Sequence, residues 1–260
     1  MMETTEQHQY DDDSDYIYIY GTRAVLEVLR AGKNLERLFI QQGLSNPLVR
    51  ELKDELRLAG IIYQQVPIEK LNRLTKSNHQ GVVGMISNIA YQKTEELVPA
   101  LFEKGVIPLL LILDRITDTR NLGAIARTAE CAGVNGIIIP SRGSALITAD
   151  AIKTSAGALH HIPVCREDNL KNTIDFLKES GIRIIACSEK TTKFTYDEDL
   201  TQPTALIMGS EENGVSTEYL KRCDAAVKIP MTGNISSYNV SVATGMILYE
   251  ALRQRTQKIN

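Results

Sequence analysis

The sequence predicts an α/β protein in two parts: a small layered α/β domain, then a larger domain whose mostly parallel sheet carries helices on both faces. Three observations lead to this prediction. Strand-like and helix-like segments alternate along almost the whole chain of 260 residues. Residues 109–113 are uninterrupted Leu and Ile, which is typical of a central parallel strand. Apolar periodicity fades over residues 89–107, which indicates a linker between domains at 16–88 and 108–260.

The first fifteen residues differ in composition from the rest. Residues 1–15 contain six Asp or Glu and no Lys or Arg. We expect them to be a disordered acidic tail, because they hold too little apolar surface to fold. Residues 16–88, in contrast, contain ten Lys or Arg against six Asp or Glu. This domain therefore permits contacts with phosphate groups, although the whole chain has a net charge of −3.

Apolar spacing and turn residues define the elements of the first domain. A helix over residues 47–59, for example, ends at Gly60, a common helix terminator. The predicted helices are 24–29, 47–59 and 68–74, and the predicted strands are 35–40, 61–66 and 82–86.

The second domain continues the alternation. Its predicted strands are 109–113, 137–139, 162–165, 183–186, 204–208 and 225–229, and its predicted helices are 122–132, 149–158, 170–178, 216–222 and 238 to about 252. Ligands of such sheets bind at the carboxyl ends of the strands. The loops that follow 109–113, 204–208 and 225–229 are therefore expected to meet.

Several classes of protein are excluded by the sequence. No apolar run is long enough to span a membrane, and the first residues are acidic and polar, unlike a secretory leader. The four cysteines are far apart, which favours reduced, mostly buried thiols in a cytoplasmic protein. Neither a Gly-x-Gly-x-x-Gly nor a P-loop nor a His-Glu-x-x-His pattern is present, so we expect no dinucleotide chemistry and no metal.

The first two loops combine a few polar side chains with glycine. Residues 114–121 lead into a helix with Asn121 at its start and Arg127 two turns in. An isolated arginine of this kind is more often a surface residue in a salt bridge. The second loop starts at Gly209 and holds Glu211, and glycine at a strand end lets the backbone approach a ligand. An ordinary turn has the same glycine, so these residues alone leave both interpretations open.

The third loop joins a strand to the last helix. Pro230 ends the strand because it has no N–H for a sheet, and Gly233-Asn234 permits a turn with positive φ. Small polar side chains that usually cap free N–H groups then crowd the helix start, namely Ser236, Ser237 and Asn239. Capping alone explains each of them. Together with the strand end and the turn, they also make a site for a polar ligand.

The three loops resemble the three motifs of the SpoU-type RNA 2′-O-methyltransferases. The matching residues are Asp114, Asp118, 121–125 and 127–129 in the first motif, 206–215 with Gly209, Glu211 and Gly214 in the second, and 229–231, Gly233, 236–237, 239–243 and 248–250 in the third. The resemblance implies S-adenosyl-L-methionine as the cofactor and RNA as the partner. It implies catalytic roles for Arg127, Asn121, Glu211, Ser237 and Asn239, and cofactor contacts for Gly209, Ile229, Tyr238, Met208, Met231 and Gly233. It also implies a trefoil knot and a homodimer through the knotted domain.

The proposed reaction suits this set of residues. The protein must hold an electrophilic methyl group in line with a ribose 2′-oxygen and help a weakly acidic hydroxyl lose its proton. Arginine stays protonated and is a poor base, so we expect Arg127 to stabilise the developing oxyanion and to bind the adjacent phosphate. Phosphate or water then takes the proton. The chain departs from the family pattern at Thr119, Glu212 and Tyr238, where proline, glycine and leucine respectively are common.

The first domain resembles the substrate domain of part of the SpoU family, which is similar to a ribosomal-protein RNA-binding fold. The resemblance is carried by Tyr20-Gly21, Lys33, Arg37 and residues 78–83. Arg23 is the residue of this domain that we expect to contact RNA. The bacterial enzymes that methylate guanosine 2′-oxygens in large-subunit ribosomal RNA are the most similar group. A transfer-RNA enzyme of the same family and a non-catalytic RNA-binding or assembly protein remain the alternatives.

Overall fold

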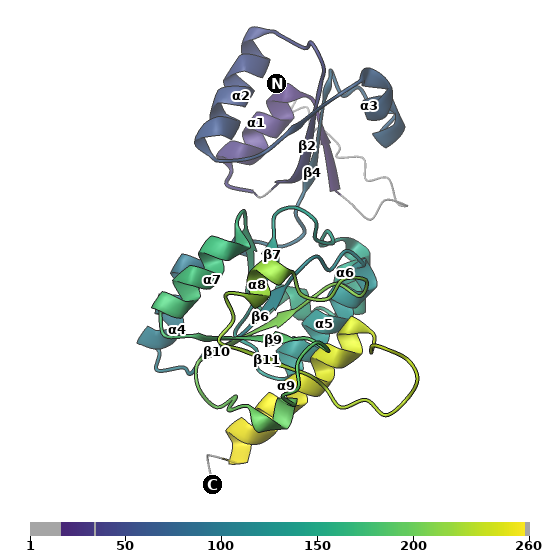
Figure 1. Cartoon of the computed structure of the whole chain (residues 1–260). Helices are drawn as coiled ribbons and strands as arrows, with labels where there is room; N and C mark the ends of the chain where they lie inside the picture. The colour runs from purple at the N-terminus through teal and green to yellow at the C-terminus, as the bar shows by residue number, and fades with distance from the viewer. Residues whose placement is uncertain (1–16, 34, 258–260) are drawn as a thin grey trace. The chain divides into compact units, whose positions relative to one another are not determined.

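The computed structural model describes residues 17–33 and 35–257, which form two compact units divided after Ala90 (Figure 1). The predicted acidic tail, residues 1–15, lies outside the described residues. Each unit has its own sheet.

The first unit is a four-stranded sheet in the order β1-β4-β2-β3. Its strands are β1 (Ile17–Tyr20), β2 (Leu35–Gln41), β3 (Gln64–Val66) and β4 (Val82–Ile86). Strand β4 runs antiparallel to β1 and β2, whereas β2 and β3 are parallel. Its helices are α1 (Thr22–Arg30), α2 (Pro47–Leu58) and α3 (Ile68–Leu74), close to the predicted ranges.

Alternate side chains of β2 point to opposite faces of the sheet and pack against different helices. Leu38 and Ile40 join a buried cluster with α1 and α2. Phe39 points to the other face, where the Nζ of Lys70 in α3 lies 5.0 Å from its ring centroid. The unit is therefore a three-layer α/β arrangement, as its alternating sequence pattern predicts.

The second unit is built on a seven-stranded sheet in the order β11-β9-β10-β6-β7-β8-β5. Every strand pair in its described residues is parallel. The strands are β5 (Tyr91–Gln92), β6 (Leu109–Leu113), β7 (Gly136–Pro140), β8 (Val164–Glu167), β9 (Arg183–Cys187), β10 (Thr204–Met208) and β11 (Ala225–Val227). Strands β6 and β10 are entirely buried at the centre, as the apolar run at 109–113 predicts.

Helices cover both faces of this sheet (Figure 1). One face packs against α4 (Thr94–Glu103), α7 (Leu170–Glu179) and the short α8 (Thr217–Leu220). On the other side α5 (Thr119–Cys131) contacts both α6 (Ala149–Thr154) and the long α9 (Val240–Gln257). Two 3₁₀ turns, η1 (Ala158–His160) and η2 (Thr195–Asp197), lie in the connections. The predicted class, a parallel sheet between helices, is confirmed.

The stretch predicted as a linker, residues 89–107, with part of it (Leu97, Leu101 and Phe102) as a helix, belongs to the second unit from Tyr91 onward. It contains β5, which pairs with β8, and α4, whose Leu97 and Val98 enter the core of the second unit. The N–H and Oγ1 of Thr94 donate to Oε1 of Glu167 at 2.9 and 2.7 Å. A strand of two residues is too short to show an alternating pattern. It forms because it pairs with a strand near residue 164, which is distant in the chain.

The chain order of the strands reverses between β6 and β10. Moving outward from this pair, the sheet continues through β7 and β8 on one side and through β9 and β11 on the other. The register pairs Leu113 with Met208, Met208 with Cys187, and Cys187 with Val227. The carboxyl ends of β6, β10, β9 and β11 therefore stop at one level, beside a reversal point where open α/β sheets bind ligands.

The last helix is tied down at its far end by Arg255. Its guanidinium donates to four backbone carbonyls, those of Leu200 (2.9 Å), Ile107 (2.9 Å), Pro108 (3.1 Å) and Gln202 (2.8 Å). Burial lowers the pKa of Arg255 from its usual value. Ile107 and Pro108 precede β6, and Leu200 and Gln202 precede β10. These bonds therefore hold α9 against both segments.

Candidate functional site

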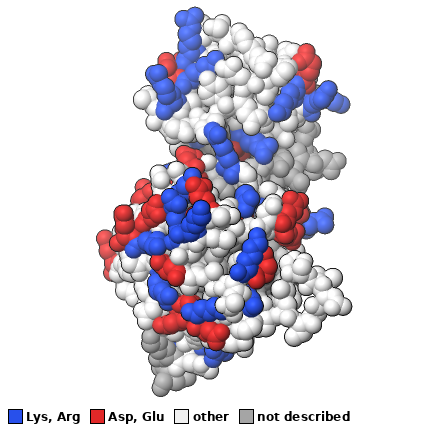
Figure 2. Space-filling model, in the orientation of Figure 1, with Lys and Arg blue, Asp and Glu red and all other residues white. Residues whose placement is uncertain are grey.

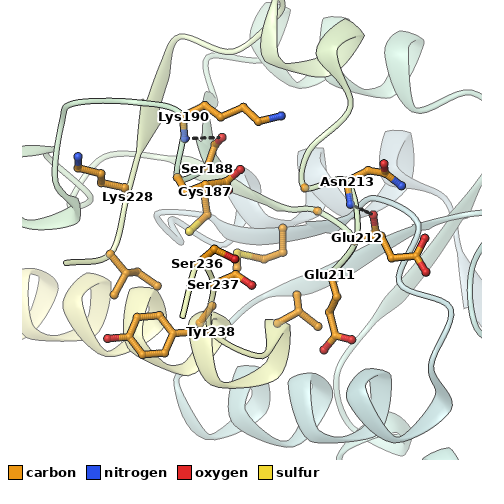
Figure 3. A pocket seen from close by; sticks show the side chains of 18 of the residues that line it. Cys187, Ser188, Lys190, Glu211, Glu212, Asn213, Lys228, Ser236, Ser237 and Tyr238 are labelled. Atoms are coloured by element: carbon orange, nitrogen blue, oxygen red, sulfur yellow. Dashed lines mark hydrogen bonds between the residues drawn. The ribbon is translucent and has the colours of Figure 1, made fainter. Parts of the chain in front are cut away.

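A cavity of about 370 Å³ opens at the carboxyl ends of β9, β10 and β11 (Figure 3). Three loops line it: residues 187–190 after β9, 208–214 after β10, and 228–240 between β11 and α9. Five of the six residues predicted to contact a cofactor line this cavity, namely Met208, Gly209, Ile229, Met231 and Tyr238. The sixth, Gly233, does not, and nothing lies within 4 Å of the Cβ position built on it.

The third loop differs in detail from its prediction. Strand β11 ends at Val227 rather than at residue 229, and α9 begins at Val240 rather than 238. Positive φ angles do not occur at Gly233 or Asn234. The positive-φ turn that these residues permit is not formed, because the loop is open and exposed and needs no tight reversal at these positions.

Gly209 is required by the close approach of two backbone segments. A Cβ on this residue would lie 2.0 Å from the carbonyl carbon of Gly214 and 2.1 Å from the nitrogen of Val215. The hairpin-like turn is closed by the N–H of Gly214, which donates to the carbonyl of Ser210 at 2.8 Å. Only glycine fits at this strand end, so the second loop can fold back and present Glu211.

A buried carboxylate joins the first loop to the second. Asp114, 1% exposed, accepts hydrogen bonds at one oxygen from the N–H (2.7 Å) and the Oγ (2.6 Å) of Ser216. Arg115 pairs with the same carboxylate through its Nε at 2.9 Å and donates to the carbonyl of Gly214 at 3.1 Å. Asp114 stands at the end of β6 and Ser216 follows β10, so this bond network fixes the two loops relative to each other.

The three loops meet at Glu211. Its Oε1 accepts from the Nδ2 of Asn239 at 2.6 Å and from the Nδ2 of Asn121 at 3.1 Å. The Nδ2 of Asn239 also lies 3.1 Å from the Oδ1 of Asn121. Each motif contributes one member to this Asn–Glu–Asn network. The expectation that the three loops converge is therefore met by hydrogen bonds and not only by proximity.

Both asparagines stand at helix starts. The N–H of Asn121 donates to the Oδ1 of Asp118 at 2.7 Å, which caps α5. The Oδ1 of Asn239 accepts from the N–H of Ser241 at 3.0 Å, which caps α9. Asn239 thus serves as a cap through its oxygen, as the capping interpretation predicts, and as a network member through its nitrogen.

The two serines at this helix start face the cavity instead of capping. Ser236 and Ser237 line the cavity, and Figure 3 shows both side chains at its centre. Among the described residues neither hydroxyl has a hydrogen-bond partner, so both are available to a ligand.

The arginines singled out by the sequence lie outside this network. Arg127 is exposed on α5, six residues after Asn121, which corresponds to about 9 Å along the helix axis. It forms no ion pair within the described part of the chain. Arg23 is exposed on α1 in the first unit. Neither contributes to the cavity wall.

The wall after β9 was not identified from the sequence. Ser188, Glu189 and Lys190 line the cavity. Their position directly after a parallel strand is the one feature of the sequence that could have predicted a role in ligand binding. With Lys228, Glu211 and Glu212, they give the cavity charged groups of both signs. Burial raises the pKa of the neighbouring Cys187 thiol to about 12, so this cysteine stays protonated and is neither a base nor a nucleophile.

No cluster of three or more His, Cys, Asp or Glu side chains suited to a metal ion is found in residues 17–33 and 35–257. No helix in the same ranges combines the length and apolar character of a membrane span.

Comparison with known proteins gives matches over both units. The profile of the SpoU rRNA Methylase family matches residues 108–249, and that of RNA 2′-O ribose methyltransferase substrate binding matches residues 18–92. A Bacillus subtilis (strain 168) protein named for the TrmH family of tRNA/rRNA methyltransferases is 36% identical over 238 residues, covering 92% of this chain and 96% of its own.

Solved structures agree with this match. The SpoU methyltransferase AviRb from Streptomyces viridochromogenes, in complex with the cofactor AdoMet, superposes with a TM-score of 0.60 at 26% identity, over 94% of this chain and 92% of that one. The AdoMet-bound rRNA methyltransferase from Sinorhizobium meliloti gives 0.57 at 26% identity, over 95% and 90%.

Proposed function

Because the chain belongs to the SpoU family of RNA methylases, we propose that it transfers a methyl group from S-adenosyl-L-methionine to a ribose 2′-oxygen in structured RNA. The observation that supports this most directly is the convergence of Asn121, Glu211 and Asn239 beside a cavity at the sheet's reversal point. The cofactor supplies an electrophilic methyl group, and the protein supplies position, charge and a path for the proton.

The cavity fits the proposed cofactor. S-adenosyl-L-methionine combines an adenosine moiety with a sulfonium cation, an ammonium and a carboxylate. Met208, Ile229 and Met231 offer an apolar wall, and Gly209 allows the backbone to come close. Glu189 and Lys190 provide charges of both signs on the rim. A net cationic, internally zwitterionic ligand matches this mixture better than a phosphate does.

We assign the Asn–Glu–Asn network to orientation of the acceptor ribose. Glu211 holds both amides through one oxygen, so its other oxygen can accept a hydrogen bond from the substrate hydroxyl. Ser237, which also lines the cavity, contributes a further donor. Arg127 stabilises the developing oxyanion and binds the neighbouring phosphate, a task that suits its unpaired guanidinium.

The substrate that we favour is a guanosine of large-subunit ribosomal RNA. The match of residues 18–92 to a substrate-binding profile supports RNA recognition by the first unit. In the face shown in Figure 2, basic side chains dominate the first unit, whereas both charges mix over the second. Arg23 is exposed on α1 and available for a phosphate contact. A transfer RNA is the alternative substrate, and the relatives' names cover both.

We further propose a homodimer through the second unit. One side of α9 exposes four apolar residues, which a second copy would cover: Val242 (50% exposed), Met246 (39%), Tyr249 (68%) and Leu252 (39%). The proposed knot would thread this helix past residues 188–203, and the Arg255 bonds to Leu200 and Gln202 support that arrangement. We expect the protein to work in the cytoplasm.

The test is transfer of a labelled methyl group to ribosomal RNA, followed by mapping of 2′-O-methyl marks in RNA from a deletion strain. Glu211→Gln and Arg127→Ala should each reduce transfer at least 100-fold, within the range of a lost positioning or oxyanion group. Glu179→Gln, an exposed change on α7 away from the cavity, is the matched control. Binding of RNA without any transfer by the wild-type protein would favour the non-catalytic alternative and refute the proposal.

A further inference from the structure

The cavity wall between β11 and α9 is held by very few interactions. Within the described chain, residues 229–238 form no backbone–backbone hydrogen bond. One side-chain bond crosses the base of this loop: the hydroxyl of Tyr238 donates to the carbonyl oxygen of Pro230 at 3.1 Å. It closes a loop of nine residues near the point where the chain leaves β11 and the point where it enters α9.

The rest of the loop is largely exposed and has no backbone hydrogen bond that could replace this one. Residues 231–239 are all exposed, and Ile235 at the tip is 78% exposed. Its two ends are nevertheless fixed, because Lys228 pairs with the segment before η2 and Asn239 belongs to the Asn–Glu–Asn network. The conformation between these ends therefore depends on the Tyr238 hydroxyl.

The same loop provides a large part of the cavity. Ile229 and Met231 precede the crossing, Ser236 and Ser237 follow it, and Tyr238 itself lines the wall. In Figure 3 the Tyr238 ring lies beside these serines, with its hydroxyl pointing away from them. The ring thus contacts the cavity while the hydroxyl binds the backbone across the loop base.

We propose that Tyr238 is a positioning residue that sets the affinity for the cofactor by clasping the loop 230–238 in its binding conformation. This inference rests on the proposed function. A loop that is already held in its binding conformation loses less conformational entropy when the ligand binds. The clasp should therefore act on affinity and much less on the chemical step.

Tyr238→Phe tests the clasp because it removes the hydroxyl and keeps the ring. Calorimetric titration with S-adenosyl-L-methionine should show a Kd raised about 3- to 10-fold, which corresponds to about 0.7 to 1.4 kcal/mol. In the transfer assay the KM for this compound should rise by a similar factor while kcat stays within about 2-fold. Proteolysis within residues 231–237 should also become faster, since the loop has lost its cross-link.

Tyr196→Phe is the matched control. Tyr196 is 54% exposed on η2, stacks on Phe194 and has no hydroxyl partner among the described residues. Its Kd should equal that of the wild type.

Two results would overturn the inference. If Tyr238→Phe binds like the wild type while Tyr238→Ala binds weakly, the ring matters and the hydroxyl does not. If Tyr238→Phe lowers thermal stability but leaves Kd and KM unchanged, the bond is structural only. A wild-type protein that shows no uptake of the compound would instead refute the proposed function itself, together with this inference.

Discussion

Gly209→Ala should disable the site by displacing the second loop. The added Cβ would lie 2.0 Å from the carbonyl carbon of Gly214, 2.1 Å from the nitrogen of Val215 and 2.4 Å from the oxygen of Gly214. All three are backbone atoms, so no side chain can rotate away. Ordinary contacts begin near 3.4 Å, so the turn must move by about 1.4 Å, beyond what a packed interior absorbs without strain.

Two contributions lower the free energy of unfolding of this variant. Overpacking of this kind costs about 1–3 kcal/mol. Loss of the 2.8 Å bond between Gly214 and Ser210 adds about 1 kcal/mol. We therefore expect urea unfolding to show a free energy lower by about 2–4 kcal/mol. Because Glu211 moves with the loop, methyl transfer should fall about 100-fold, the usual effect of a 1 Å misplacement.

Gly233→Ala is the matched control for this prediction. The Cβ position built on Gly233 has nothing within 4 Å, and the residue does not line the cavity. This variant should have the free energy of unfolding of the wild type, so it separates the steric clash at Gly209 from the loss of a glycine. A Gly209→Ala protein with wild-type unfolding and binding would refute the packing argument.

Three further predictions concern the supports of the site. Asp114→Asn leaves Ser216 facing an amide instead of a carboxylate and should lower the free energy of unfolding by about 2 kcal/mol in urea titrations. Arg255→Lys can satisfy only some of four carbonyls; it should cost about 2–3 kcal/mol, seen as a Tm lower by roughly 5–10 °C in calorimetry. The pKa of Cys187 is raised to about 12 from 9.0, so the folded state retains its proton longer than the unfolded state does. Between pH 9 and 12 the stability contributed by this thiol should decline as pH rises, and Cys187→Ala should flatten that part of the urea-unfolding profile.

Sequence pattern identified the parts of the fold that depend on local spacing and burial. Strands β6 and β10 were recognisable because both are covered on two faces and read as continuous apolar runs. The meeting of three loops followed from a general property of parallel sheets, whose carboxyl ends share one edge. The individual site residues came from the resemblance to the SpoU motifs and not from spacing.

What the sequence did not indicate depends on contacts between distant residues. The partner of Asp114 lies 102 positions away at Ser216, and no periodicity relates the two. Strand β5 exists only through its pairing with β8. The helical position of Arg127 was predicted correctly as exposed, yet spacing alone could not show that it stands outside the network formed by Asn121.

The bond between Asn121 and Asn239 joins residues 118 positions apart. During synthesis, the first motif is therefore complete long before its counterpart emerges from the ribosome. A growing chain that has already folded its first unit still lacks the amide that closes the network. Methyl transfer should consequently appear late and abruptly, once the last motif has been synthesised.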